Sequence, residues 1–303
     1  MMNAEQVVAF FNWASSGDVD IALKDYALLI AASTGHTFFV SRFLQEGRNT
    51  DFGRTYAFIE AARKGHTAAL LLLLPYCTRQ MPLDFALVEA SGAGHFNCVQ
   101  YLRPYCSEKT HSIAFFKSLN AQQWWMSSYW MSLSTLEIAP EDVLALMGAA
   151  VDLTSCTSLT HQYAYNDAAI LGQWDKMQRL SAFCDPSMRG VALLQAAVRG
   201  AIVVVQNLAP QCAASDIVMA LIQAANQEQD ASVCVLKTLC STSLLAQVKY
   251  CALLQDNWKV LASLEKIHRV PFVYFSGNIE RSEGVELAPS AANNLSSKLH
   301  KRK

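Results

Sequence analysis

The sequence is poor in charge and lacks the short motifs that mark most metal and catalytic sites. Only 16% of the 303 residues are charged and the net charge is −1, so no overall field favours nucleic acid or an anionic membrane. No Cys-x-x-Cys or His-x-x-x-His pair occurs, and no phosphate-binding glycine-rich loop or paired-carboxylate signature is present. We therefore expect no cofactor, no metal, no nucleic acid and no small-molecule substrate.

Long hydrophobic runs are also missing, although 52% of the residues are hydrophobic. The longest wholly apolar run, residues 68–75, is far shorter than the roughly 20 residues that a spanning helix needs. The N-terminus lacks the basic start and long apolar core of a signal peptide. These features predict a cytoplasmic chain without a membrane span, whose apolar helices are packed on two sides.

One pattern, clearest in residues 55–74, organises the chain. Apolar side chains between Tyr56 and Ala62 recur at three- and four-residue spacing and so share one face of a helix. Gly65 supplies the left-handed residue that ends a helix without a Cβ penalty. A second short helix follows, with Leu73 on its inner face. Such a helix pair needs similar neighbours on both sides to bury its apolar faces.

Equivalent break positions recur along the chain at intervals of 24 to 30 residues. They are Gly35, Gly65, Gly94, Gln122, Gly148, Gly172, Gly200, Glu228 and Asp256. This period predicts an all-α helical-repeat solenoid of about nine helix pairs over residues 1–267, capped by a helix at 4–16. The register predicts that one leucine in each of four second helices is buried: Leu73, Leu102, Leu180 and Leu208.

Residues 53–66, Gly-Arg-Thr-Tyr-Ala-Phe-Ile-Glu-Ala-Ala-Arg-Lys-Gly-His, resemble the ankyrin segment from the turn through the first helix to the Gly-His break. The resemblance is strong over residues 17–106 and weaker over 167–265. It departs from the family because no unit begins Thr-Pro-Leu-His and the units are shorter than the usual length of about 33 residues. The projecting β-turn fingers should therefore be stunted or missing. The resemblance implies that three histidines tie the breaks to neighbouring backbone: His36, His66 and His95.

Regularity falls between residues 120 and 166, where the intervals shorten, the alanine pairs vanish and aromatic residues gather. Trp124 and Trp130 fall in apolar columns of the repeat, so we expect both in the core. Trp125 falls in a column that is otherwise mixed and often polar, which predicts an exposed anchor for a partner, together with Tyr129. A shifted register would instead bury Trp125.

Stacked helix pairs create an extended concave surface, and binding is the function that such a surface serves. We therefore expect a module that binds an unidentified partner protein on its concave face and inter-repeat loops. The candidate contacts are Trp125, Tyr129, Arg48, Arg54 and Arg79. Analogy at the level of the fold extends this to a secreted effector of an intracellular microbe, acting in the host-cell cytoplasm.

Two alternatives stay open. The first is an enzyme with a degenerate catalytic insertion in residues 120–166, where Cys156, His161 and Asp167 would form a thiol, a base and an acid. The second is a purely structural spacer within a complex.

The cysteines follow the spacing of the repeat. Five of the nine cysteines fall twelve residues after a break. Successive side chains of one column lie about 10 Å apart, beyond disulfide reach, so we expect small buried spacers. These five are Cys77, Cys106, Cys184, Cys212 and Cys240.

The C-terminal segment, residues 268–303, is rich in Ser, Asn, Glu and Lys, and this composition predicts a disordered tail. Its basic end, 298–303, is either a signal that binds an acidic surface or a solubilising remnant.

Overall fold

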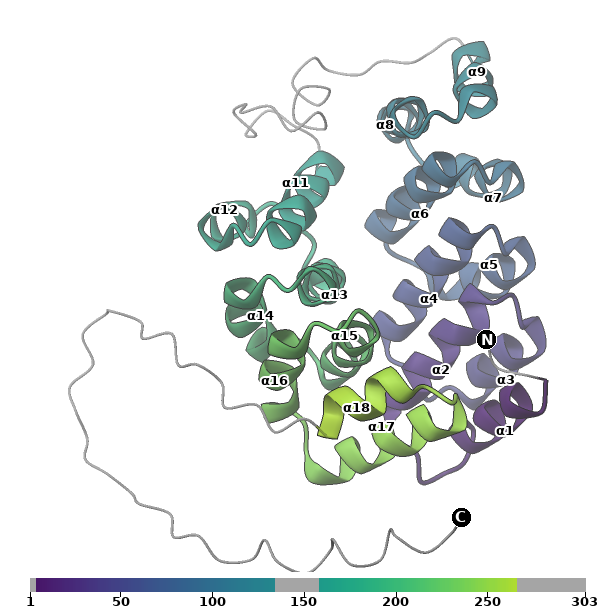
Figure 1. Ribbon diagram of the computed structural model, residues 1–303. Helices are drawn as coiled ribbons and strands as arrows, with labels where there is room; N and C mark the ends of the chain where they lie inside the picture. The colour runs from purple at the N-terminus through teal and green to yellow at the C-terminus, as the bar shows by residue number, and fades with distance from the viewer. Residues whose placement is uncertain (1–3, 134–157, 266–303) are drawn as a thin grey trace, which may run out of the picture. The chain divides into compact units, whose positions relative to one another are not determined.

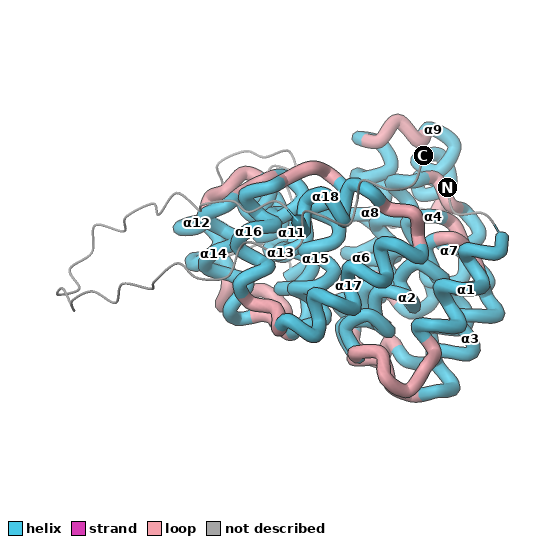
Figure 2. Tube along the Cα trace, turned by 60° about the horizontal axis from the view of Figure 1, so that its bottom comes forward, coloured by secondary structure: helices cyan, strands magenta, loops and turns pink. Residues whose placement is uncertain are grey.

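The structure is a computed structural model that describes residues 4–133 and 158–265. Every regular element in them is helical, and no strand is seen in the traces of Figure 1 and Figure 2. The predicted all-α class is confirmed. Within the described ranges, no helix combines the length and apolarity needed to cross a membrane. The predicted tail lies outside the described residues.

The N-terminal half begins with the single helix α1 (Ala4–Ala14), close to the expected capping helix. Four helix pairs follow: α2 (Ile21–Ser33) and α3 (Thr37–Glu46), α4 (Asp51–Lys64) and α5 (Thr67–Leu73), α6 (Gln80–Ala93) and α7 (Phe96–Leu102), and α8 (Glu108–Asn120) and α9 (Trp124–Ser132). Short 3₁₀ turns extend α5 and α7 at η1 (Leu74–Tyr76) and η2 (Arg103–Tyr105).

Four further pairs follow residue 158: α11 (Ser158–Ile170) and α12 (Trp174–Leu180), α13 (Arg189–Arg199) and α14 (Ile202–Leu208), α15 (Ala214–Asn226) and α16 (Asp230–Thr238), and α17 (Thr242–Leu254) and α18 (Trp258–Glu265). The 3₁₀ turns here are η4 (Pro186–Met188) and η5 (Ala209–Gln211). The predicted pair around Gly148 lies outside the described residues.

The residue at each described break has a left-handed backbone. Positive φ occurs at Gly35, Gly65, Gly94, Gln122, Gly172, Gly200, Glu228 and Asp256, which are the predicted break positions. The four leucines of the register are buried, from 0% exposed at Leu73 and Leu102 to 4% at Leu180. The predicted register is confirmed at these positions, because glycine conformation and helical periodicity are local properties of the chain.

The helix pairs form two series, which we name the N-arm (α2–α9) and the C-arm (α11–α18). Within the N-arm the first helices pack in the order α2, α4, α6, α8, and within the C-arm α11 packs on α13 and α13 on α15. The arms meet where α2 packs against α15 (Figure 1). Ten of the 13 residues of each of these two helices are buried. Because both helices are covered on most sides, apolar side chains occur on nearly every face of them.

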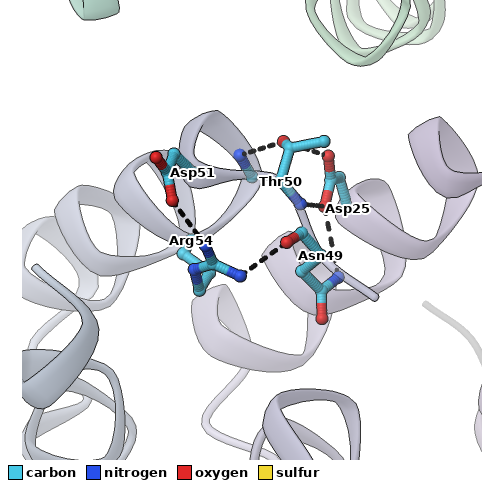
Figure 3. Close-up of polar contacts among 6 residues, drawn as sticks. Asp25, Asn49, Thr50, Asp51 and Arg54 are labelled. Atoms are coloured by element: carbon cyan, nitrogen blue, oxygen red, sulfur yellow. Dashed lines mark hydrogen bonds and ion pairs between the residues drawn. The ribbon is translucent and has the colours of Figure 1, made fainter. Parts of the chain in front are cut away.

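A buried carboxylate on α2 fixes the loop that leads into α4 (Figure 3). Asp25 is fully buried and accepts hydrogen bonds from the side chain of Asn49 and from the backbone N–H and hydroxyl of Thr50. The Thr50 hydroxyl in turn accepts from the N–H of Gly53 at 3.0 Å and caps α4. Ser215 of α15 donates a further hydrogen bond to Asp25, so this cluster also joins the two arms.

Candidate functional site

The first candidate site is an aromatic cluster on α7 and α9. Trp125 is 49% exposed, and its indole lies edge-on to the ring of Phe96 with centroids 5.7 Å apart. Phe96 makes a second edge-to-face contact, at 4.9 Å, with Tyr129. Arg103 donates a hydrogen bond to the Tyr129 hydroxyl at 2.9 Å. Trp125 is therefore exposed, as predicted, and its neighbours restrict its position.

The structure separates the other two tryptophans of this region. Trp130 is fully buried and stacks on His111 with centroids 5.3 Å apart, so its expected core position is confirmed. Trp124 is 63% exposed, so the expectation of a core residue was wrong. It is the first residue of α9, and the equivalent first residue of α18, Trp258, is 67% exposed. The equivalent first residues of α7 and α12, Phe96 and Trp174, are partly buried against the core, so the exposure is particular to α9 and α18.

The three candidate arginines lie in the N-arm, away from the unit that carries Trp125: Arg48 and Arg79 in loops, and Arg54 in the first turn of α4. Arg48 is exposed in the loop between α3 and α4. Arg54 is held against the preceding loop, because its guanidinium donates to the carbonyl of Asn49 and to Asp51 (Figure 3). Arg79 is exposed and forms an ion pair with Asp185 of the C-arm at 3.8 Å. The structure does not gather these residues around Trp125.

A second candidate site is a groove lined by the first helices of both arms; binding on a concave face was predicted, but none of the five candidate partner contacts lines this groove. A cavity of 310 Å³ lies between α6, α8 and α11, and a second of 300 Å³ lies between α2, α4, α13 and α15. A third, of 150 Å³, shares lining residues with both. We name this continuous depression the inter-arm groove. Six of its lining residues belong to one column, five positions before a break: Glu60, Glu89, Lys117, Asp167, Gln195 and Gln223.

Two sets of a tyrosine, a carboxylate and a cation line this groove. In one, the Tyr163 hydroxyl donates to Glu89 at 3.0 Å, and Lys117 Nζ lies 3.6 Å from Glu89 and 5.0 Å from the centre of the Tyr163 ring. In the other, Tyr56 bonds to Glu60, whose carboxylate also binds Arg63.

Burial raises the pKa of both tyrosines well above the usual value, so they remain neutral donors. Two acid–base pairs neutralise four of the charged side chains in the walls of the groove, Glu60 with Arg63 and Glu89 with Lys117.

Of the residues suggested for catalysis, His161 and Asp167 lie in the described part of the chain, both on α11 but in different surroundings. His161 is buried and stacks on Phe183 with centroids 4.8 Å apart. Asp167 lines the inter-arm groove with Lys117, and burial raises the pKa of its carboxyl while Lys117 and Lys176 oppose that shift. Cys156 lies outside the described residues. Among those residues there is also no group of three or more His, Cys, Asp or Glu side chains placed to hold a metal ion.

Two of the three histidines after the breaks, His66 and His95, have the backbone contacts that the resemblance implied, and His36 does not. His66 Nε2 lies 2.9 Å from the carbonyl oxygen of Ser33, and His95 Nε2 lies 3.0 Å from that of Arg63. Each imidazole therefore ties one unit to the end of the preceding first helix. His36 has no preceding unit of this kind, and its Nδ1 contacts the Thr34 hydroxyl at 2.6 Å.

The signal that marks the groove was present in the sequence. The column five positions before the break is polar or charged in six units, although the helices around it are apolar. That this column lines a groove could not be predicted, because it depends on how the two arms face each other and no local sequence pattern encodes that.

Comparison with protein-family models finds no match to the chain, and comparison with curated proteins finds none either.

Proposed function

We propose that this protein is an ankyrin-like helical-repeat module that binds a partner protein and has no catalytic role. Left-handed breaks at regular intervals and the ties made by His66 and His95 support the ankyrin-like interpretation. Helix pairs stacked in this way offer a partner an extended concave surface built from first helices and inter-repeat loops. Trp125, on the second helix α9, adds a contact outside the first helices. We place the module in the cytoplasm, with delivery into a host cell as the extension of this proposal.

The proposal rests mainly on Trp125, whose side chain is half exposed and packs against the ring of Phe96. Half of the side chain faces solvent, yet its contact with Phe96 limits the conformational freedom that binding would remove. Tryptophans with these properties contribute most to protein interfaces. Tyr129, held by Arg103, would complete the contact area, and the exposed Arg48 and Arg79 would add polar contacts from the loops.

Affinity capture with matched variants tests this function. Wild-type protein, Trp125→Ala and Trp258→Ala are each immobilised, exposed to the same cell extract, and the proteins retained are identified and purified. We expect a partner whose Kd rises by roughly 30-fold in Trp125→Ala, which corresponds to about 2 kcal/mol. Trp258→Ala removes another exposed tryptophan and should bind normally.

The melting temperature of Trp125→Ala should stay within a few degrees of wild type, because half of the side chain is already exposed. Equal retention by all three proteins would remove Trp125 from the interface. Unfolding of Trp125→Ala would show that the residue is structural.

A further inference from the structure

We propose that the inter-arm groove is a second binding site, which holds an extended polypeptide segment of about nine residues. This inference rests on the proposed protein-binding function and adds to it a different surface from that around Trp125. The groove follows the inner faces of the first helices of both arms, through three cavities that share walls.

Side-chain amides on the C-arm suit a peptide backbone. Gln195 of α13 and Gln223 of α15 line the groove one unit apart, and both are partly exposed. Neither amide has a hydrogen-bond partner among the residues that the structure describes. A primary amide offers donors and an acceptor, as a peptide group does, so each glutamine can pair with one peptide group of a strand laid beside it.

The charges of the groove favour an uncharged backbone over a polyion. Three acidic and three basic side chains line its cavities: Glu60, Glu89, Asp167, Arg63, Lys64 and Lys117. Two of the acids are paired internally, Glu60 with Arg63 and Glu89 with Lys117. A nucleic-acid strand needs an excess of positive charge along its path, and this groove has none.

Its dimensions set the length of the ligand. The cavities extend along the first helices of four N-arm units, from α2 to α8. Three helix-to-helix spacings of about 10 Å give roughly 30 Å. An extended chain advances about 3.3 Å per residue, so roughly nine residues cover this distance.

The two larger cavities predict where the segment carries apolar side chains. Val88, Ile113 and Phe116 form an apolar wall at the α8 end, and Leu29, Leu194 and Val198 form another at the α2 end. Their centres lie about two helix spacings apart, or about 20 Å, which corresponds to about six residues of extended chain. The segment should therefore carry two large apolar residues about six positions apart.

Selection from a displayed library of random linear 12-residue peptides tests the site. The full chain is the bait, and an unrelated helical protein removes non-specific binders. Three variants are compared: Gln195→Ala with Gln223→Ala, Ala121→Trp to fill the α8 end, and a control that removes the exposed amides of Gln100 and Gln178 from outer helices. Circular dichroism melts establish that each variant is folded.

We expect enriched peptides with two apolar positions about six residues apart. Their affinity should fall at least tenfold in the Gln195/Gln223 variant and in Ala121→Trp, and should not change in the control or in Trp125→Ala. Peptides that bind all groove variants normally, or no enrichment over the unrelated protein, would overturn the groove site. Peptides lost only in Trp125→Ala would also overturn it, yet would support the proposed function, which the capture experiment decides separately.

Discussion

The ring of Phe52, near the start of α4, occupies the place where a β-carbon on Gly190 of α13 would lie. The two residues are far apart in the sequence and belong to different arms. A β-carbon at Gly190 would also lie 2.8 Å from Cγ of Asp216, on α15. This contact lets α4 approach the C-arm closely, next to the place where α2 and α15 meet.

Gly190→Ala should therefore destabilise the protein. The added methyl group overlaps the Phe52 ring, and overpacking of this kind costs about 1–3 kcal/mol. Urea unfolding followed by circular dichroism measures the loss. Gly17→Ala is the control, because a β-carbon at that position would meet no neighbouring group within 4 Å. The double variant Phe52→Ala with Gly190→Ala should lose less stability than the sum of the single variants. Strict additivity would mean that the two residues do not touch.

Stability at the junction should depend on the ionisation of Asp216. Burial raises the pKa of both Asp216 and its neighbour Asp25 to about 6, from an ordinary value of 3.8. A raised pKa means that the protonated acid stabilises the fold below pH 3.8, and that this contribution is lost as the pH rises through 6.

Asp216→Asn cannot ionise and should be more stable than wild type at pH 7.5, by on the order of 1–3 kcal/mol. The difference should vanish near pH 4. Thermal melts between pH 4 and pH 8 measure it, with the exposed Asp18→Asn as the control. A constant difference across this range would show that the Asp216 carboxyl titrates normally.

Leu102→Ala tests the repeat register. Leu102 is fully buried on α7, and truncation of such a leucine costs about 2–5 kcal/mol through lost burial and a residual cavity. Leu171→Ala should change the unfolding free energy by less than about 0.5 kcal/mol, because that leucine is 66% exposed. Chemical denaturation of both variants makes the comparison, and equal effects would contradict the register.

At a break that lacks glycine, introducing glycine should stabilise the protein. Gln122 has φ of 58°, a left-handed conformation that strains residues with a β-carbon. Gln122→Gly should therefore raise the free energy of unfolding by about 0.5–1 kcal/mol, despite the greater freedom of glycine in the unfolded chain. Lys64→Gly within α4 should do the opposite, because its backbone is helical. A loss of stability in Gln122→Gly would mean that the side chain contributes more than the strain costs.

The cysteine column should react slowly with thiol reagents. Cys77 is buried, the other four members are partly buried, and all five are free. Burial raises the pKa of the Cys77, Cys184 and Cys212 thiols to about 12, so the reactive thiolate is scarce at neutral pH. Labelling with an aromatic disulfide, followed by absorbance, should be slow in the native protein and fast in denaturant. Fast native labelling of all five would place the column in solvent.

Much of the fold could be predicted from the sequence because its rules are local. Left-handed breaks follow from glycine at regular intervals, and burial of Leu73 and Leu102 follows from helical periodicity. The exposure of Trp125 could be predicted too, since the residues that share its column are mixed and often polar. Trp124 could not, because the same apolar column holds Phe96 and Trp174, which are partly buried against the core, whereas Trp124 is 63% exposed.

The sequence by itself determined the helices, their breaks and the side chains that pack within each arm. Only the tertiary structure decided which helices of the two arms meet, and with them the Phe52–Gly190 contact, the shared burial of Asp25 and Asp216, and the inter-arm groove. The physical reason is separation along the chain. The Phe52–Gly190 contact and the electrostatic interaction of Asp25 with Asp216 join residues far apart in the sequence. No periodicity in a single helix encodes how two distant helices face each other.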